Sequence, residues 1–513
     1  MENISKNVEG KLLDTNQQNS ILSNAKRILV VAGAGSGKTT TIVGKVKYLL
    51  QVKNIDAKNI LVLSFTNASA KEMRERILKE VDVAVDAITF HKLGLNILEK
   101  SNLNDYKILT DNVNLILLDI LNDLVKDKLY LDNLISYIYE NKNKSLLKLA
   151  YKVFESESYL KLDFINLCFK FLNLVKQNGF DNHRLLVLSK NKAYQLFLQV
   201  FLPIFDKYQT HLLNNKLIDF NDMINISKKN IESKSVLLPY KEIIVDEFQD
   251  LSQGRYSLLQ AILKVNEANL FCVGDDYQCI FSFAGSELNY FVKFRKYFGN
   301  YEKYIIDKTY RFNQNLVDIS EKFVTKNPIQ LKKKVKSFNN DLSRSVEIII
   351  GEDDEDILSK LIDTLIGLPN YSKVFILGRY NGDLNLLNKS IEFDIIHRSN
   401  EVIFAKKVDL KIFFLTVHRA KGLEADFTFI INNKNGKYGF PSNKKNEKIL
   451  DYLKLKKEFY PFGEERRLFY VAITRSRKKT YLLCIKDDYS IFIKDILKQN
   501  KKSFKTLKSF LSS

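Results

Sequence analysis

A glycine-rich segment near the amino terminus has the residue types of a phosphate-binding loop. Residues 32–39 read Ala-Gly-Ala-Gly-Ser-Gly-Lys-Thr, directly after the apolar run 28–31 and before the helix-patterned stretch 40–50. Backbone N–H groups of such a loop surround a polyphosphate, while Lys38 reaches the β- and γ-phosphates and Thr39 offers its hydroxyl to Mg²⁺. The alternative is a glycine-rich turn that binds nothing. We expect a nucleoside triphosphate, ATP, to be held with Mg²⁺ by Ala34, Gly35, Ser36, Gly37, Lys38, Thr39 and Thr40.

Two adjacent carboxylates form the second feature that could do chemistry. Asp246 and Glu247 directly follow the segment Glu242-Ile243-Ile244-Val245, which has the pattern of a buried strand. Ligands of open parallel sheets bind at the carboxyl ends of the strands. We therefore expect Asp246 to hold Mg²⁺ and Glu247 to orient or deprotonate the attacking water. A solvated acidic loop is the alternative, but a phosphate loop on the same sheet favours a hydrolase.

The composition indicates what class of partner the chain binds. Its 513 residues leave room for several domains, and 80 Lys and Arg against 60 Asp and Glu give a net charge of +20. This surplus favours a polyanion, and nucleic acid fits better than a membrane because no apolar stretch approaches the length of a membrane-spanning helix. No export signal follows Met1, so we expect a cytoplasmic protein. No metal-ligand spacing is found among Cys168, Cys272, Cys279 and Cys484 or among the five histidines, so we expect no structural metal.

The pattern of apolar residues predicts an α/β fold with two parallel-sheet blocks and a helical insertion. Short β-type runs alternate with helical periodicity over residues 28–100, whereas the region after residue 101 has helical periodicity with few strand signals. The basic runs Lys332–Lys334 and Lys501–Lys508 are expected to be solvated faces or tails. Strands are predicted at 29–31, 60–65, 87–89, 242–245, 270–273, 346–350, 374–377, 412–415, 427–431 and 480–483.

With these motifs in view, the chain resembles the UvrD/Rep-like superfamily one DNA helicases over nearly all of its length. The resemblance is carried by segments such as Gly274-Asp275-Asp276-Tyr277-Gln278, Thr309-Tyr310-Arg311, the run 416–424 and the run 464–475. It implies that the nucleotide site also contains Gln17 at the adenine edge, Tyr310 stacked on adenine, Glu424 on the ribose, Gln278 as a sensor of the γ-phosphate, and Arg311 and Arg475 as its cationic contacts. A surface arginine in a basic segment is the alternative for Arg475. The implied catalytic set is Lys38, Asp246, Glu247, Gln278, Arg311 and Arg475.

The same resemblance implies a site for single-stranded DNA. The segments Phe65-Thr66-Asn67 and Thr89-Phe90-His91 match the two that hold the strand on the first motor domain of these helicases. Phe283 could stack on a base, although a core aromatic residue is the alternative at this position. The residues implied to contact DNA are Phe65, Thr66, Asn67, Thr89, His91, Phe283, Arg379 and His418.

Four segments narrow the resemblance to the bacterial DNA helicase IV type, namely Phe281-Ser282-Phe283-Ala284-Gly285-Ser286, Ile218-Asp219-Phe220-Asn221-Asp222-Met223, Leu377-Gly378-Arg379-Tyr380 and Phe440-Pro441-Ser442. The phosphate loop already begins at Ala32, so the long amino-terminal region of that type is expected to be absent. The segment between Arg379 and Thr416 is too short for the large 2B domain, and the segment after Arg475 is too short for a nuclease. The resemblance implies a first RecA-like motor domain (1A) at 1–101 and 205–286, a helical insertion (1B) at 102–204, and a second RecA-like domain (2A) at 287–513.

The function implied by the resemblance is that of an ATP-dependent translocase on single-stranded DNA that unwinds duplexes in the 3′-to-5′ direction. An alternative is an ATPase subunit that works with a separately encoded partner, such as a nuclease in a defence system, or that remodels RNA polymerase. The missing 2B region motivates this alternative.

Overall fold

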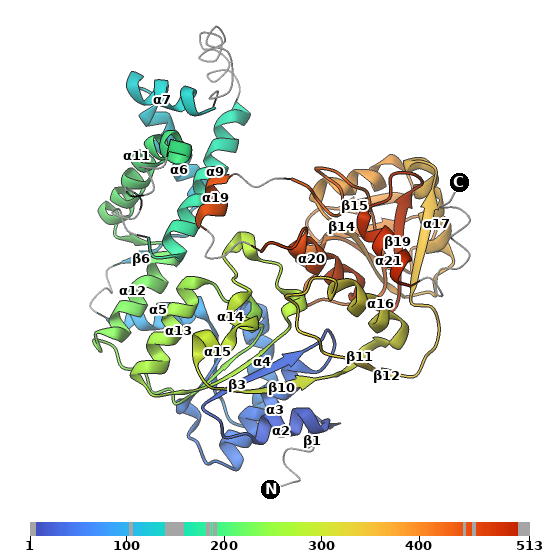
Figure 1. The fold of residues 1–513 in the computed structure, drawn as a ribbon, viewed down its shortest axis with the longest axis horizontal. Coiled ribbons are helices and arrows are strands. Elements are labelled where there is room, and N and C mark those ends of the chain that lie inside the picture. Colours follow the sequence, from blue (N-terminus) through green and yellow to red (C-terminus); the bar gives the residue numbers. More distant parts are fainter. Residues whose placement is uncertain are drawn as a thin grey trace.

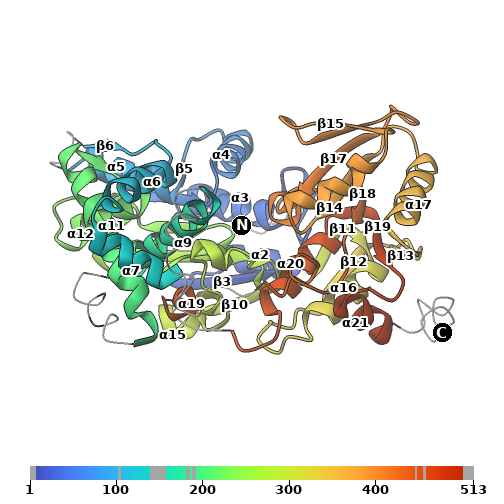
Figure 2. The same ribbon diagram turned by 90° about the horizontal axis from the view of Figure 1, so that it is seen from above.

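The computed structural model describes residues 7–101, 106–138, 158–180, 185, 187, 192–444, 448–453 and 458–500. Two α/β units lie next to each other, and a column of helices stands on the first of them (Figure 1). The view from above separates the same two units, with the helical column over the first (Figure 2). The chain therefore has the two parallel-sheet blocks and the helical insertion that its sequence predicts.

The first unit is built on a six-stranded sheet in which all neighbouring strands are parallel. Successive residues of its strand β3 enter different cores, since Leu29 and Val31 pack on one face and Ile28 and Val30 on the other. Both faces are covered by helices, as parallel sheets require. In spatial order the strands are β10 (Glu302–Ile306), β3 (Arg27–Ala32), β9 (Asn269–Gly274), β8 (Glu242–Val245), β4 (Ile60–Ser64) and β5 (Asp86–Thr89).

The helices of the first unit include several that begin at the residues expected to bind ligands. Its α-helices are α2 (Thr15–Leu22), α3 (Lys38–Gln51), α4 (Asn67–Val81), α5 (Phe90–Glu99), α12 (Phe220–Glu232), α13 (Gln253–Val265), α14 (Asn289–Val292) and α15 (Phe294–Phe298). Short elements are β1 (Asn7–Val8), β2 (Lys11–Leu12), η1 (Ala57–Asn59), η3 (Phe248–Asp250), η4 (Asp276–Gln278) and η5 (Ser282–Ala284).

Two of the expected domain boundaries are wrong. Strand β10 pairs in parallel with β3, from Glu302 opposite Ile28 to Ile306 opposite Ala32, so the first sheet extends past the expected boundary at residue 286. Helix α11 (Lys192–Asn214) runs without a break through the expected boundary at residue 204. Both errors arise because a boundary depends on which sheet or helix pairing a segment joins, and not on its composition.

The helical column has its own hydrophobic core, and a short helix from the second half of the chain packs against it. Phe171 packs edge-on against Phe197 and Phe201, with ring centroids 5.0 and 4.7 Å apart. Helix α19 (Lys448–Leu453) lies against α9, and Asn178 Nδ2 donates to the Leu453 carbonyl at 2.7 Å (Figure 1). The column consists of α6 (Val113–Leu124), α7 (Lys128–Ile138), α9 (Ser158–Gln177) and α11, with β6 (Lys107–Ile108) and β7 (Leu217–Ile218) at its base.

The second unit contains a seven-stranded sheet that is parallel except at β16, which is antiparallel to both neighbours. In spatial order its strands are β13 (Val346–Gly351), β19 (Ser476–Ile485), β18 (Ala425–Ile430), β14 (Lys373–Gly378), β17 (Lys411–Thr416), β16 (Glu401–Phe404) and β15 (Phe393–Ile396). Residues 380–415 form η6 (Asn381–Lys389), β15, β16 and most of β17, and therefore extend this sheet instead of forming a further domain.

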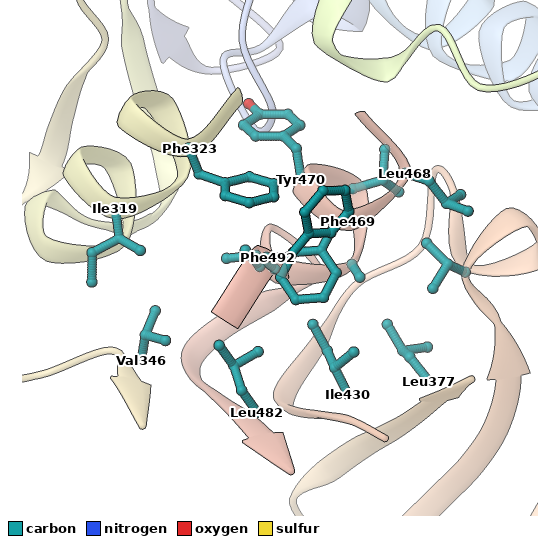
Figure 3. Close-up of a cluster of buried hydrophobic side chains, with 14 of the residues drawn as sticks. Ile319, Phe323, Val346, Leu377, Ile430, Leu468, Phe469, Tyr470, Leu482 and Phe492 are labelled. Atoms are coloured by element: carbon teal, nitrogen blue, oxygen red, sulfur yellow. The ribbon is translucent and has the colours of Figure 1, made fainter. Parts of the chain in front are cut away.

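The core of the second unit reaches to the junction with the first. Phe323, Phe469 and Phe492 meet at its centre, above Leu482 and Ile430 of the sheet (Figure 3). Ala34, Tyr277 and Ile280, which belong to the first unit, pack in the same cluster. The remaining elements are α16 (Gln314–Val324), α17 (Asp354–Ile366), α18 (Val417–Ala420), α20 (Gly463–Ile473) and α21 (Ile491–Gln499), with the strand pair β11 (Lys308–Asn313) and β12 (Lys336–Asn339).

Candidate nucleotide and DNA sites

The glycine-rich loop joins β3 to α3 at the carboxyl edge of the first sheet. Gly35 and Gly37 have φ of 71° and 82°, a left-handed backbone that glycine adopts without strain. A Cβ at Gly35 would lie 2.5 Å from Arg311 Cβ, so the second unit approaches the loop closely. The Thr309 hydroxyl donates to the Ala34 carbonyl at 2.8 Å and the Tyr310 N–H to the Gly35 carbonyl at 3.0 Å. Strand β11 therefore holds the loop in a junction between the two units.

Lys38, the first residue of α3, forms an ion pair with the second of the two adjacent carboxylates. Its Nζ lies 2.6 Å from Glu247 Oε1. Burial works to raise the pKa of Glu247, but Lys38 and then Lys421 hold that pKa below its ordinary value. Burial, followed by the charge of Glu247, raises the pKa of Asp246. Glu247 has φ of 45°, an unusual backbone for a residue with a side chain and one that is typical of functional sites.

A buried polar network connects this pair to the segment that contains Gln278. Gln249 donates to Glu247 and accepts from the Asp275 N–H at 2.9 Å, and Gln278 Nε2 donates to Asp275 Oδ2 at 2.6 Å. Lys333 completes the network: its side chain is fully buried, bonds Asp275 and lies 2.8 Å from Asp276 Oδ1. The expectation that Lys332–Lys334 is a solvated run is wrong for this residue, because it comes from the second unit and neutralises carboxylates of the first.

Two residues of the second unit that are expected to contact the nucleotide form an ion pair with each other. Arg311 Nε donates to Glu424 Oε2 at 2.8 Å, and Arg477 bonds the other oxygen of Glu424. A residue expected at the ribose and one expected at the γ-phosphate thus neutralise each other beside the phosphate loop. Arg477, whose position in a basic run is typical of a surface residue, is connected to the site.

Arg475 is a second buried cation that the second unit contributes to the junction. It is 1% exposed and donates to the carbonyls of Val471 and Leu423 at 2.8 and 3.1 Å and to the Thr474 hydroxyl at 3.2 Å. Burial, together with the neighbouring Arg311, lowers the pKa of Arg475 to about 9. The interpretation of Arg475 as a surface arginine is therefore wrong, and its charge has no carboxylate partner within the part of the chain that the structure describes.

The residues expected around the base lie beside the start of α3. Gln17 closes a capping box with Asp14 and donates from Nε2 to the Thr41 hydroxyl at 3.1 Å, so its amide is held by the protein. Tyr310 is 45% exposed, as a ring that stacks on a base must be. The Thr40 hydroxyl donates to Glu9 at 3.0 Å, whereas the Thr39 hydroxyl forms no hydrogen bond with the described residues.

The residues expected to bind DNA on the first unit gather at the ends of β4 and β5. Thr66 and Thr89 cap helices α4 and α5 by accepting backbone N–H groups, and Asn67 follows as an exposed first residue of α4. Phe65 lies beneath the guanidinium of Arg255, 5.0 Å from its ring centroid. His91 contacts Phe220 in a tilted arrangement, with ring centroids 4.8 Å apart. Burial, and then Arg255, lowers the pKa of His91 to about 4.

The remaining expected DNA contacts lie where the two units meet. Phe283 is 66% exposed, which removes the core alternative, and its ring is edge-on to His418 at 5.3 Å. Arg379 forms an ion pair with Glu465, with Nη2 2.7 Å from Oε1, so the charge of Arg379 is already compensated. Lys421, one turn after His418, bonds Asp250 at 2.5 Å and lies 4.0 Å from Glu247 Oε2. A single short segment of the second unit therefore contacts both expected sites.

Comparison with known proteins identifies the family to which the chain belongs. Residues 13–299 match the UvrD/REP helicase N-terminal domain, and residues 395–487 match the UvrD-like helicase C-terminal domain. The chain belongs to the UvrD/Rep helicase family. It is 29% identical over 508 residues to DNA helicase IV of Escherichia coli, covering 96% of this chain and 71% of that protein. It is also 26% identical to the ATP-dependent DNA helicase Rep of Buchnera aphidicola from Schizaphis graminum, covering 95% of this chain and 70% of that protein.

Membership in this family makes the chain an ATP-dependent hydrolase of the DNA helicase class. Among the described residues no helix is both long and apolar enough to cross a bilayer. All four cysteines are buried as free thiols, and the described residues contain no group of three or more His, Cys, Asp or Glu side chains placed to bind a metal.

The donor set around the phosphate loop fits Mg²⁺ held together with a polyphosphate. Asp246 presents a carboxylate whose second oxygen forms no hydrogen bond with the described residues, and the Thr39 hydroxyl is similarly unused. Carboxylate and hydroxyl oxygens are the ligands that Mg²⁺ takes from a protein when phosphates supply the rest.

Several residues of these sites were missed by the sequence analysis. Lys333, Lys421 and Arg255 have no local signal beyond their charge, because their partners lie in distant segments of the chain. Lys421 lies within a segment that carried the family resemblance, and its type was therefore visible although its partner was not.

Proposed function

We propose that the chain is an ATP-driven motor that translocates along single-stranded DNA and unwinds duplexes in the 3′-to-5′ direction. The observation that supports this proposal is that both units contribute residues to the junction between them. The glycine-rich loop, Lys38 and Glu247 belong to the first unit, whereas Arg311, Glu424 and Arg475 belong to the second. A nucleotide bound at this junction would contact both units, so its hydrolysis would change the contacts that hold the two units together.

The chemistry assigned to the first unit follows from the Lys38–Glu247 ion pair. A polyphosphate in the loop would take Lys38 as its counter-ion and release Glu247, whose pKa would then rise toward its ordinary value as its main stabilising cation leaves. Glu247 would then accept a proton from, or orient, the attacking water. Mg²⁺, held by Thr39 and Asp246, would add charge compensation at the phosphates.

The second unit would supply positive charge to the transferred phosphoryl group. Arg311 would leave Glu424 for a phosphate, and Glu424 would then accept a hydrogen bond from the ribose. Arg475 is positioned beside Arg311 with no carboxylate of its own among the described residues, so an anion would satisfy both. Gln278 is held by Asp275 at 2.6 Å and would report the presence of the γ-phosphate to the buried network.

Lys421 is the residue through which we expect DNA and ATP to be coupled. It bonds Asp250 and the Gln278 carbonyl, at 2.5 and 2.8 Å, and follows His418 in the same segment. A shift of this segment on binding a strand would move a cation that also lies near Glu247. Phe283, exposed beside His418, would stack on a base at about 1–3 kcal/mol, equivalent to roughly five- to 150-fold in affinity.

Strand-separation assays with labelled duplexes carrying a 3′ tail, a 5′ tail or no tail test the proposal. We expect unwinding of the 3′-tailed duplex only, dependent on ATP and Mg²⁺. Lys38→Ala should abolish ATP hydrolysis and unwinding while binding to single strands stays within a few-fold, because the loop and the strand contacts are separate. Unwinding of the 5′-tailed substrate alone would overturn the proposed direction.

The alternative function, an ATPase subunit that requires a separately encoded partner, is decided by the same assays. The short segment between Arg379 and Thr416 favours it, because these residues extend the second sheet and add no large accessory domain. ATP hydrolysis stimulated by single strands with no unwinding of any duplex would support this alternative. An unwinding monomer would exclude it.

A further inference from the structure

A cation without a polar partner among the described residues lies beside those expected to bind DNA on the first unit. Arg255 is the third residue of α13, and its guanidinium lies 5.0 Å from the ring centroid of Phe65. This guanidinium forms no ion pair or hydrogen bond with the described residues, although many other arginines there are paired. A partly buried charge that makes only a cation–π contact retains most of its hydrogen-bonding capacity for a ligand.

The carboxylate whose charge affects the pKa of Arg255 already forms an ion pair with another residue. Asp250 raises the pKa of Arg255, against the larger lowering caused by burial, but Asp250 is ion-paired with Lys421 at 2.5 Å. The aromatic ring of Phe65 stabilises the cation weakly in comparison with an anion. The position therefore favours an anionic ligand that arrives from outside the protein.

The surroundings of Arg255 suit one nucleotide of a single strand. Phe65 belongs to the segment that follows β4, and His91 lies close enough for Arg255 to lower its pKa. Phe220, whose ring is tilted against that of His91, is 50% exposed. The imidazole is neutral near pH 7 because its pKa is about 4, so it adds an aromatic face and no charge. An exposed aromatic face beside a guanidinium is the usual composition of a site for a base and its phosphate.

We propose that Arg255 contacts a backbone phosphate of the bound single strand and is held for this purpose on the ring of Phe65. The inference rests on the proposed function. It adds a residue of α13, the helix between Asp246-Glu247 and Asp275-Asp276, to the residues expected to bind single-stranded DNA. Arginine binds phosphate through paired N–H donors, which a lysine at the same place cannot reproduce.

The salt dependence of strand binding tests this role directly. Affinity for single strands falls with salt by a slope of about 0.7 for each phosphate contact. Between 0.05 and 0.5 M NaCl, the affinity of the wild-type protein for labelled oligo(dT) should therefore fall about fivefold more than that of Arg255→Gln. Arg255→Lys should keep the wild-type slope with weaker affinity. Lys264→Gln, an equal charge change at an exposed position near the end of the same helix, should match the wild-type slope.

The outcomes separate this inference from the proposed function. Absence of salt-dependent binding to oligo(dT) by the wild-type protein would overturn the proposed function. Normal wild-type binding with an unchanged slope for Arg255→Gln would overturn only the role of Arg255. Arg255→Met, whose unbranched side chain can cover Phe65, repeats the test if the glutamine variant does not fold. Unfolding of both variants would also overturn the inference, since it would make Arg255 a structural residue.

Discussion

Replacement of Arg475 by methionine should separate catalysis from stability. Burial, and then Arg311, lowers the pKa of Arg475 to about 9, well below the ordinary value of an arginine, so the charged form costs several kcal/mol. An anion that compensates the guanidinium during phosphoryl transfer could recover energy of this size. Arginines that contact a transferred phosphoryl group accelerate hydrolysis by roughly 10³ to 10⁵.

The expected result is a large loss of turnover with a small change in stability. Arg475→Met should lower the kcat of ATP hydrolysis at saturating oligo(dT) by at least about a hundredfold. Its free energy of unfolding should stay within about 2 kcal/mol of the wild-type value, because the variant removes an uncompensated buried charge while it leaves two carbonyls without a donor. Steady-state hydrolysis and urea denaturation measure the two quantities.

Lys478 provides the matched control for Arg475. Its side chain is 57% exposed, and its carboxylate partner, Asp426, is 3.9 Å away. Lys478→Met should leave both kcat and the free energy of unfolding nearly unchanged. Arg477 does not serve as a control, because it bonds Glu424. A kcat for Arg475→Met within threefold of the wild-type value would refute the reasoning that places this charge at the phosphoryl group.

Three further predictions follow from the site. Glu247→Gln should bind ATP, as measured by fluorescence titration of a labelled analogue, but hydrolyse it at least about a hundredfold more slowly; loss of nucleotide binding would contradict its assigned role. Lys333→Met should lower the free energy of unfolding in urea by about 3–5 kcal/mol, because it leaves two buried carboxylates without their cation; a loss below about 1 kcal/mol would contradict the ion pairing. Burial lowers the pKa values of His91 and His418 to about 4, so the unfolded chain binds more protons between pH 4 and 6.5, and stability should fall as the pH falls through this window. Each histidine should contribute about 1 kcal/mol of this loss at pH 5.5, against a smaller and opposite contribution from Asp246 and Asp250, whose pKa values burial raises to about 6. A melting temperature that is higher at pH 5.5 than at pH 7.5 would contradict this expectation.

Three strands of the two large sheets were not predicted from the sequence, β10, β15 and β16, and all lie at or next to a sheet edge. Strand β10 reads Glu-Lys-Tyr-Ile-Ile and lies at the edge of the first sheet, where most of its residues stay accessible to water. Edge strands lack the continuous apolar run by which a central strand such as β3 is predicted. The antiparallel pair β15 and β16 lies at the edge of the second sheet and was missed for the same reason.

The sequence alone determined those parts of the protein that depend on neighbouring residues. The phosphate loop, the Asp246-Glu247 pair and the central strands were predictable because glycine backbone freedom, helix termini and apolar runs act over a few residues. The tertiary structure decided which charges meet. Lys333 pairs with Asp275, Arg311 with Glu424, and Arg255 with Phe65, and in each case the two residues come from distant segments of the chain. A side chain's burial and its partner are set by packing between such segments, so composition and spacing could not assign them.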